Sequence, residues 1–239
     1  MTVGAAGGVG AESVDEPGED PGFARGRAGE RGTAEAAGGV TAAQEQSPQL
    51  ARLMDAGLQL FGTAGYEATT IRALCSSARV STRDFYRHVH DRPHLFRAVF
   101  EREVRRVLSA VTLALADLPP VVEVRTRAWL QEWMGAMVAD RRRYRVLYTE
   151  AVGVSEELER HRRALLAASC ELGMRQLELC AAARGERHPE RHYEIPAITL
   201  FGSAREMLVR YMSGMLSTSD VDDLVDQYVR LCVLVGESW

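Results

Sequence analysis

The sequence predicts an all-α fold of about nine helices, and three observations support this class. From residue 47 onward, apolar residues recur every three or four positions, the spacing that places them on one face of a helix. Serine, threonine or aspartate precedes several of these runs, as expected for helix N-caps. No segment shows a convincing apolar–polar alternation of the kind that marks a half-buried strand.

Composition divides the chain into four segments. Residues 1–46 contain eleven of the 21 glycines and almost no large apolar residues, so they cannot bury enough surface to offset the entropy of ordering. We expect a disordered, acidic and glycine-rich arm there. Residues 47–92 form a first helical domain and residues 93–118 a connecting helix. The "DLPP" break at 117–120 leads into a second domain, residues 119–239.

The first domain contains two short helices joined by a tight corner. One apolar face of a preceding helix ends at "GTAGY", residues 62–66. Thr69 or Thr70 caps a second helix. After the corner at residues 78–80, Ser81 starts a third helix, with Asp84 as its capping-box partner. Asp91 caps a long fourth helix. In the second domain, helical patterns recur over 121–139, 142–153, 155–184, 194–215 and 219–236.

Basic charge gathers in the first domain, although the whole chain has a net charge of −4. Residues 1–47 carry eight acidic residues and three arginines, whereas residues 48–106 carry ten arginines and six acidic residues. The chain contains no lysine, so every basic side chain is the forked guanidinium that matches phosphate. A DNA-binding surface requires this distribution of charge.

Metals, cofactors and membranes are not expected. The four cysteines are scattered, which argues against a zinc site or a disulfide framework. His188 and His192 have a spacing that suits a metal on one helix face, but Pro189 and the neighbouring charges favour a solvated loop. The chain has no apolar run long enough to span a membrane and no apolar leader, so we expect a cytoplasmic protein without cofactor or metal.

Two short helices around a three-residue corner make a helix-turn-helix, whose second helix fits the major groove of double-stranded DNA. Thr82, Arg83 and Arg87 are the expected base readers, because arginine bridges two acceptors of guanine and threonine meets a thymine methyl group or a base edge. Thr70, Tyr86 and Arg92 are better placed for phosphates. The predicted DNA-binding set is Thr70, Arg79, Ser81, Thr82, Arg83, Tyr86, Arg87, His88 and Arg92.

The stretch "GLQLFGTAGYEATTIRALCSSARVSTRDFYRHVHDRPHLF", residues 57–96, closely resembles the DNA-binding domain of the TetR family of bacterial regulators. The residue pairs Leu60-Phe61, Gly65-Tyr66, Thr69-Thr70, Val80-Ser81 and Phe85-Tyr86, together with His88 and Arg92, fall in register with the family pattern. Arg79 departs from it, since the family has glycine at this corner. A positive φ there costs a non-glycine residue about 1 kcal/mol. Arg79 is therefore a strained, solvent-exposed corner or an additional phosphate contact.

The resemblance implies that the second domain encloses an effector cavity and that its last two helices pair the chain into a homodimer. Aromatic and sulfur-containing side chains suit a cavity for a largely hydrophobic effector, although ordinary core packing is the alternative for each residue. The expected cavity residues are Trp129, Trp133, Met137, Tyr148, Cys170, Met174 and Phe201. The expected dimer seam is Ala197, Phe201, Ala204, Leu208, Tyr211, Leu224, Tyr228 and Leu231, with packing inside one subunit as the alternative.

These features together predict a dimeric, ligand-responsive DNA-binding regulator. A repressor that a small-molecule effector releases from a near-palindromic operator fits the pattern best. An effector-independent activator is one alternative. A ligand carrier or enzyme with a vestigial helix-turn-helix is another, although no residue lies in a recognisable catalytic setting.

Overall fold

The computed structural model describes residues 47–185, 193–218 and 220–238. The arm predicted for residues 1–46, and His188 and His192, lie outside these ranges. The described residues form nine α-helices and one π-helix, with no strand among them. The predicted all-α class is confirmed.

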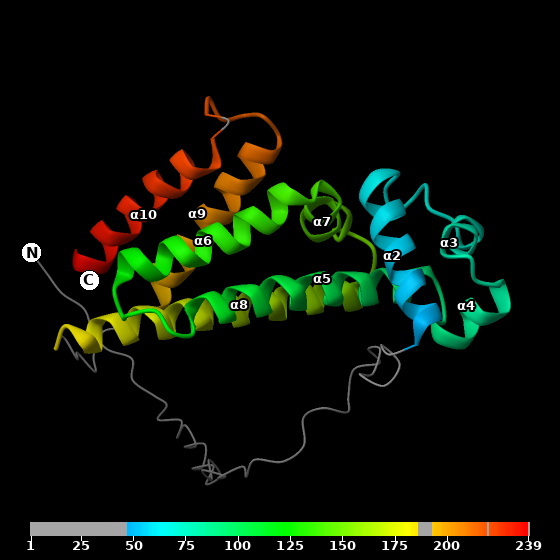
Figure 1. The fold of residues 1–239 in the computed structure, drawn as a ribbon, viewed down its shortest axis with the longest axis horizontal. Helices are drawn as coiled ribbons and strands as arrows, with labels where there is room; N and C mark the ends of the chain where they lie inside the picture. The colour runs from blue at the N-terminus through cyan, green and yellow to red at the C-terminus, as the bar shows by residue number, and fades with distance from the viewer. Residues whose placement is uncertain (1–46, 186–192, 219, 239) are drawn as a thin grey trace, which may run out of the picture. The chain divides into compact units, whose positions relative to one another are not determined.

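The first group of helices is α2 (Pro48–Thr63), α3 (Ile71–Ala78) and α4 (Thr82–His88), followed by the long α5 (Arg92–Leu115). A side chain caps the N-terminus of three of these four helices. The hydroxyl of Thr70 accepts the N–H of Ala73 and that of Ser81 accepts the N–H of Asp84, while the Asp91 carboxylate caps α5. Helices α3 and α4 both pack against α2, which is the arrangement of a helix-turn-helix (Figure 1).

Apolar side chains from all four helices meet in one core. Phe61, Phe85 and Phe96 are fully buried there, and the rings of Phe61 and Phe96 meet edge to face with their centroids 5.0 Å apart. The same core also takes Val146 from a later part of the chain. The DNA-binding fold is therefore packed directly onto an element of the second domain.

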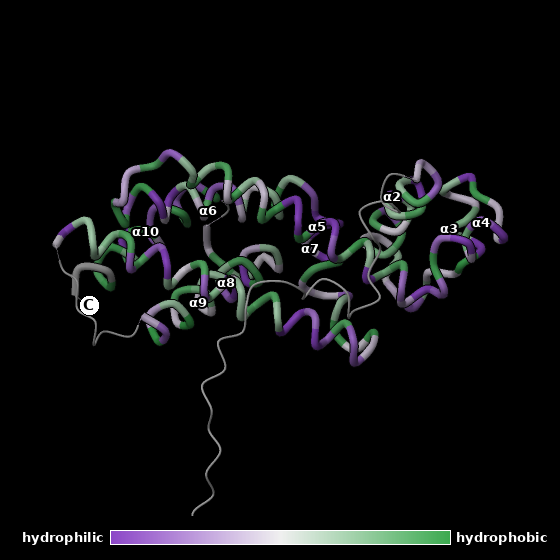
Figure 2. The backbone as a smooth tube through the Cα atoms, turned by 90° about the horizontal axis from the view of Figure 1, so that it is seen from below, coloured by the Kyte–Doolittle hydropathy of each residue, from purple (hydrophilic) through white to green (hydrophobic). Residues whose placement is uncertain are grey.

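The remaining helices are α6 (Val122–Ala139), α7 (Arg141–Tyr144), the π-helix η1 (Arg145–Glu150), α8 (Glu156–Ala183), α9 (Glu194–Met212) and α10 (Val221–Ser238). Helix α6 packs against α5 and α10, and α8 packs against α9. Hydrophobic and hydrophilic stretches alternate along each helix in Figure 2, as expected for amphipathic helices that bury one face. Their buried faces form a second core that includes Leu130, Met134 and Leu208.

Burial of most of the predicted seam residues favours the alternative of packing inside one subunit. Five of these side chains are buried inside the single chain: Ala197, Ala204, Leu208, Leu224 and Tyr228. Tyr211 is half-buried, and Leu231 is exposed. The periodicity identified the buried face of each helix correctly, but periodicity alone does not tell which neighbour covers that face.

None of the described helices is long and apolar enough to cross a membrane. Within the same ranges, no group of histidine, cysteine and acidic residues is arranged to hold a metal ion.

Candidate nucleic-acid interface and ligand cavity

Helix α4 presents the predicted base readers to solvent. Thr82, Arg83 and Arg87 are exposed, and Tyr86 keeps 54% of its surface accessible. On the opposite face, Phe85 is fully buried and fixes the helix to the core. Arg87 is held by its ion pair with Asp84 (Nη1 to Oδ1, 2.9 Å). The helix therefore presents two guanidinium groups and a threonine outward on a rigid support.

The hydroxyls of Thr70 and Ser81 serve as helix caps. Thr70 Oγ1 accepts the N–H of Ala73 at 3.1 Å, and Ser81 Oγ accepts the N–H of Asp84 at 3.0 Å. The Ser81 hydroxyl also donates to Asp84 Oδ2 at 2.6 Å, and this bond is the main cause of the lowered pKa of Asp84. Both caps are exposed beside the recognition helix. His88, at the end of α4, lies with Nε2 3.4 Å from Ser47 Oγ.

Arg92 is held against its own domain. Its guanidinium lies 4.2 Å from the ring centroid of Tyr66, and Nη1 donates to the carbonyl of Thr69 at 3.0 Å. A second donor contact reaches the carbonyl of Glu67 at 3.3 Å. These contacts brace the loop between α2 and α3, so the structure adds a positioning role that the sequence did not predict.

Arg79 occupies the corner between α3 and α4 in the left-handed conformation, with φ 53° and ψ 47°. It is the one non-glycine residue with a positive φ among the described residues. The N–H of Val80 donates to the carbonyl of Cys75 at 3.0 Å, which closes the helix end in the manner of a Schellman motif. The arginine side chain is exposed. The backbone strain expected at this corner is therefore present.

Two adjoining cavities lie between α5 and the helices that follow it. The larger has a volume of about 340 Å³ and is lined by residues of α5, α6, η1, α8 and α9. Six of the seven predicted cavity residues line it: Trp129, Trp133, Met137, Tyr148, Cys170 and Phe201. Met174, the seventh predicted residue, lines neither cavity. Phe201 lines both cavities, so it belongs to the cavity wall.

Aromatic contacts hold the wall of the larger cavity in place. The rings of Trp129 and Trp133 stack with centroids 5.5 Å apart, and Phe201 packs 4.8 Å from Trp129. The indole N–H of Trp133 donates to the Tyr148 hydroxyl at 3.1 Å. Burial raises the pKa of Tyr148 to about 12, so its hydroxyl is neutral at pH 7. The cavity is thus mostly apolar, with few fixed polar groups.

The π-helix η1 connects this cavity to the DNA-binding fold. Leu147 and Tyr148 line the cavity, whereas Val146 is buried in the helix-turn-helix core. Glu150, at the end of η1, accepts the backbone N–H of Tyr66 at 2.8 Å and a hydrogen bond from Arg145 Nη2 at 2.6 Å. The sequence predicted a helix over residues 142–153, but not its π-helical geometry, because π-helices are short and have no periodic pattern of their own.

The exposed helix α4 and its capped partner α3 define a DNA-binding protein of the helix-turn-helix class. Residues 53–99 match the family model for bacterial regulatory proteins of the tetR family, which covers the DNA-binding domain and the start of α5. This match confirms the resemblance drawn from the sequence. Residues 53–99 therefore form a DNA-binding domain of the TetR type.

Solved structures share the fold over most of the chain. The fatty acid degradation regulator FadR from Bacillus halodurans is 16% identical, with a TM-score of 0.69, and the match covers 79% of this chain and 96% of that one. FadR from Bacillus subtilis, solved in complex with stearoyl-CoA, is 13% identical with a TM-score of 0.67, covering 77% and 97%. A tetR-family protein from Rhodococcus RHA1 is 22% identical with a TM-score of 0.62, covering 79% and 96%. No curated protein sequence matches the chain.

Proposed function

We propose that the protein is a homodimeric repressor that a small, largely hydrophobic effector releases from a near-palindromic operator. The observation that carries the proposal is the double role of η1. Leu147 and Tyr148 on this element line the cavity, while Glu150 holds the N–H of Tyr66 in the DNA-binding fold. A ligand that displaces Tyr148 would therefore shift η1 and, with it, α2 and α3. The DNA-bound and released states would then differ in the hydrogen bond between Glu150 and Tyr66, as a two-state switch requires.

An acyl chain is the effector class that fits the larger cavity. Its volume of about 340 Å³ and its apolar walls suit a flexible hydrocarbon, and methionine and aromatic side chains adapt to such a ligand. The complex of Bacillus subtilis FadR with stearoyl-CoA, which shares the fold, supports the same class. The polar groups at the wall, including Arg205, would orient the ligand.

The dimer would form through the outward faces of α9 and α10. Ile195 of α9 and Leu231 of α10 are exposed, with 64% and 45% of their surface accessible. These positions replace the buried ones of the predicted seam. Exposed apolar side chains on two neighbouring helices suit a four-helix seam around a two-fold axis. Pairing there would set two copies of α4 for successive major grooves, about one helical turn apart.

Selection of bound duplexes from a random pool tests DNA recognition. The enriched site should be a near-palindrome, and binding should weaken steeply with salt because phosphate contacts release counterions. Arg83→Ala should lower affinity for that site by about 1–3 kcal/mol. Arg175→Ala is the matched control, since it removes an exposed arginine of α8 that pairs with Glu171. Equal affinity for all duplexes, or equal losses in both variants, would exclude sequence-specific reading by α4.

Sedimentation of a charged variant tests the dimer. Leu231→Glu should shift the protein toward the monomer, because a carboxylate would be buried in the proposed seam. Leu113→Glu places the same charge on α5, where the leucine is 79% exposed, and should leave the oligomeric state unchanged. If both variants sediment like the parent protein, the seam lies elsewhere.

A further inference from the structure

Arg125 is a buried guanidinium held only by neutral groups of the described chain. It is 8% exposed, and it lines the smaller of the two cavities. Its Nε donates to the side-chain oxygen of Gln176 at 2.7 Å, and Nη1 donates to the carbonyl of Leu118 at 2.6 Å. Neither acceptor is charged. A buried charge without a counter-ion is costly, so this site is electrostatically incomplete.

Another buried arginine of the chain has the carboxylate partners that Arg125 lacks among the described residues. Arg97 is 6% exposed and pairs with two carboxylates, those of Glu101 and Glu157. No carboxylate of the described residues forms an ion pair with Arg125, and its Nη2 makes no hydrogen bond within the same part of the chain. The guanidinium thus retains unused donors on its terminal nitrogens, the pair of atoms that binds a carboxylate through two parallel hydrogen bonds.

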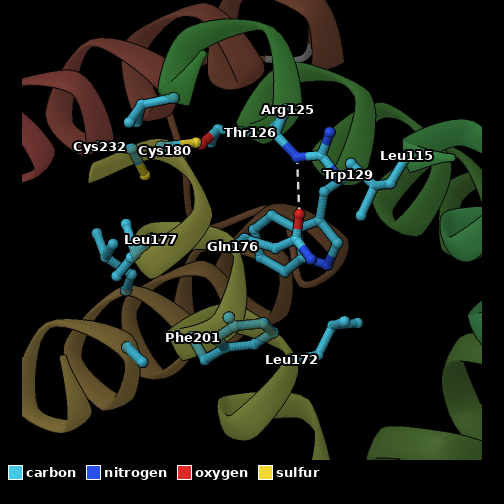
Figure 3. Close-up of a pocket in the computed structure, with 14 residues that line it drawn as sticks. Leu115, Arg125, Thr126, Trp129, Leu172, Gln176, Leu177, Cys180, Phe201 and Cys232 are labelled. Atoms are coloured by element: carbon cyan, nitrogen blue, oxygen red, sulfur yellow. Dashed lines mark hydrogen bonds between the residues drawn. The ribbon is translucent and has the colours of Figure 1, made fainter. Parts of the chain in front are cut away.

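The space in front of Arg125 is small and otherwise mainly apolar. Figure 3 shows Arg125 of α6 and Gln176 of α8 joined by their hydrogen bond, with Trp129 beside them and Phe201 and Leu172 across the cavity. The volume is about 70 Å³. A single water needs about 10–15 Å³ by this measure, so the cavity admits a group of only a few heavy atoms. A carboxylate and its first methylenes have that size.

We propose that the effector is an aliphatic carboxylic acid whose carboxylate pairs with Arg125. The hydrocarbon chain occupies the larger cavity, which adjoins the smaller one because Trp129, Leu172 and Phe201 line both. This inference rests on the proposed function, since it names the head group of the proposed effector. It distinguishes a free acid from its thioester, because a thioester carbonyl carries no charge to complete the Arg125 site.

Two other arginines line the larger cavity and offer competing sites for a head group. Arg162 is already engaged by Glu159, with Nε and Nη2 each within 2.9 Å of a carboxylate oxygen. Arg205 lies 5.9 Å from the ring centroid of Tyr148 and is half-buried. Arg205 is therefore the competitor that an experiment must separate from Arg125. Arg125 is favoured because it is more deeply buried, so pairing relieves a larger desolvation cost.

Binding of dodecanoate and of 1-dodecanol to the purified full chain tests the proposal, with tryptophan fluorescence as the readout because Trp129 lines both cavities. Dodecanoate should bind at least about tenfold more tightly than the alcohol, a difference of about 1.4 kcal/mol. Dodecanoyl-CoA supplies the thioester of the same chain length. Because its carbonyl is uncharged, the thioester should lack the gain in affinity that pairing with Arg125 gives to dodecanoate.

Substitution of Gln176 gives a matched pair of variants. Gln176→Glu places an internal carboxylate where the amide now accepts from Arg125 Nε, so the internal group competes with the ligand. Dodecanoate should then bind about tenfold more weakly, while dodecanol binding stays within about twofold. Gln176→Leu removes the acceptor without adding charge and should retain the preference for the acid. Thermal melting of each variant establishes that it is folded before titration.

The outcomes separate this inference from the proposed function. Equal affinity for the acid and the alcohol, or for the acid and the thioester, overturns the carboxylate assignment while an apolar effector stands. Loss of acid binding in Arg205→Gln but not in Gln176→Glu moves the head group to Arg205 and also overturns it. If neither dodecanoate nor dodecanol binds and neither shifts operator affinity, the apolar effector itself fails together with this inference.

Discussion

The carboxylate of Glu150 accepts the backbone N–H of Tyr66 at 2.8 Å, across 84 residues of sequence. The turn that it holds includes Gly65, whose φ of 95° requires glycine. Arg145 completes the contact, since it donates to Glu150 and also to the carbonyl of Thr63. One ion pair of η1 therefore secures both the end of α2 and the turn that follows.

Replacement of Glu150 by alanine should uncouple the cavity from the DNA-binding fold. The variant loses two accepted hydrogen bonds from a partly buried carboxylate, so its free energy of unfolding should fall by about 1–3 kcal/mol. The ratio of operator affinities without and with effector should also shrink. Urea denaturation and operator titration measure the two effects.

Glu132→Ala provides the matched control for Glu150. Glu132 is an exposed glutamate of α6, and its loss should change the free energy of unfolding by no more than about 0.5 kcal/mol. A Glu150→Ala protein that is destabilised but keeps the full effector response would show that the contact is structural and that the signal takes another route.

At Gly62, α2 lies close to the backbone of α7. A Cβ added there would lie 2.4 Å from Arg142 Cβ and 2.6 Å from Arg142 Cα. Alanine should therefore destabilise the protein despite its higher helix propensity, because backbone atoms cannot yield as a flexible side chain can. The expected loss is about 1–3 kcal/mol in the free energy of unfolding, measured by urea denaturation.

Gly135→Ala is the internal comparison for Gly62→Ala. Gly135 lies within α6, and an added Cβ meets no atom within 4 Å. Alanine at this position should stabilise the protein by about 0.5–1 kcal/mol. An equal stabilisation by Gly62→Ala would contradict this prediction. It would show that α2 and α7 can move apart without loss of stability.

Local signals predicted the helix-turn-helix almost completely. Ser81 and Asp91 were predicted as N-caps from the sequence, and Thr69 or Thr70 as a third. The side chains of Thr70, Ser81 and Asp91 each accept a backbone N–H in the first turn. Capping depends on residues three positions apart, so it can be read from a single sequence. The apolar periodicity likewise located the helices, because it depends only on which face is buried.

Contacts between distant segments could not be predicted in the same way. Ala204 and Leu208 were assigned to a partner chain, but other helices of the same chain bury them. Arg125 shares a helix face with Val122 and Trp129, and an arginine at such a position was the available signal of a buried charge. Its neutral partners Leu118 and Gln176 follow only from the fold.

Arg79→Gly should stabilise the protein. The corner has a φ of 53°, where glycine is free of the steric cost that arginine bears, so the free energy of unfolding should rise by about 0.5–1 kcal/mol. Arg79→Ala keeps the strain and removes the charge. Both variants should show the same change in operator affinity if Arg79 contacts a phosphate, with a salt dependence shallower by about one charge. A stability of Arg79→Gly no higher than that of Arg79→Ala would show that the corner is not strained.

His94 should make the protein less stable in mild acid. Its Nδ1 accepts the backbone N–H of His90 at 3.2 Å, so the proton of the neutral ring lies on Nε2, which is buried without a partner among the described residues. Burial lowers the pKa of His94 below 6.5, and the charges of Arg97 and His90 lower it further, while Asp91 and Glu157 oppose them. The unfolded chain therefore binds more protons than the folded one between the lowered pKa and 6.5, and stability falls as the pH drops through that window.

His94→Asn isolates this contribution, because an amide oxygen can accept the His90 N–H and does not titrate in that range. Urea denaturation at pH 7.5 and at pH values below 6.5 should show a smaller acid-induced loss of stability in the variant than in the parent protein. The difference should vanish above pH 7, where the parent ring is neutral in both the folded and the unfolded chain. An identical dependence on pH in the two proteins would mean that the acid sensitivity arises from other groups and that the partly buried ring takes up its proton at no cost to the fold.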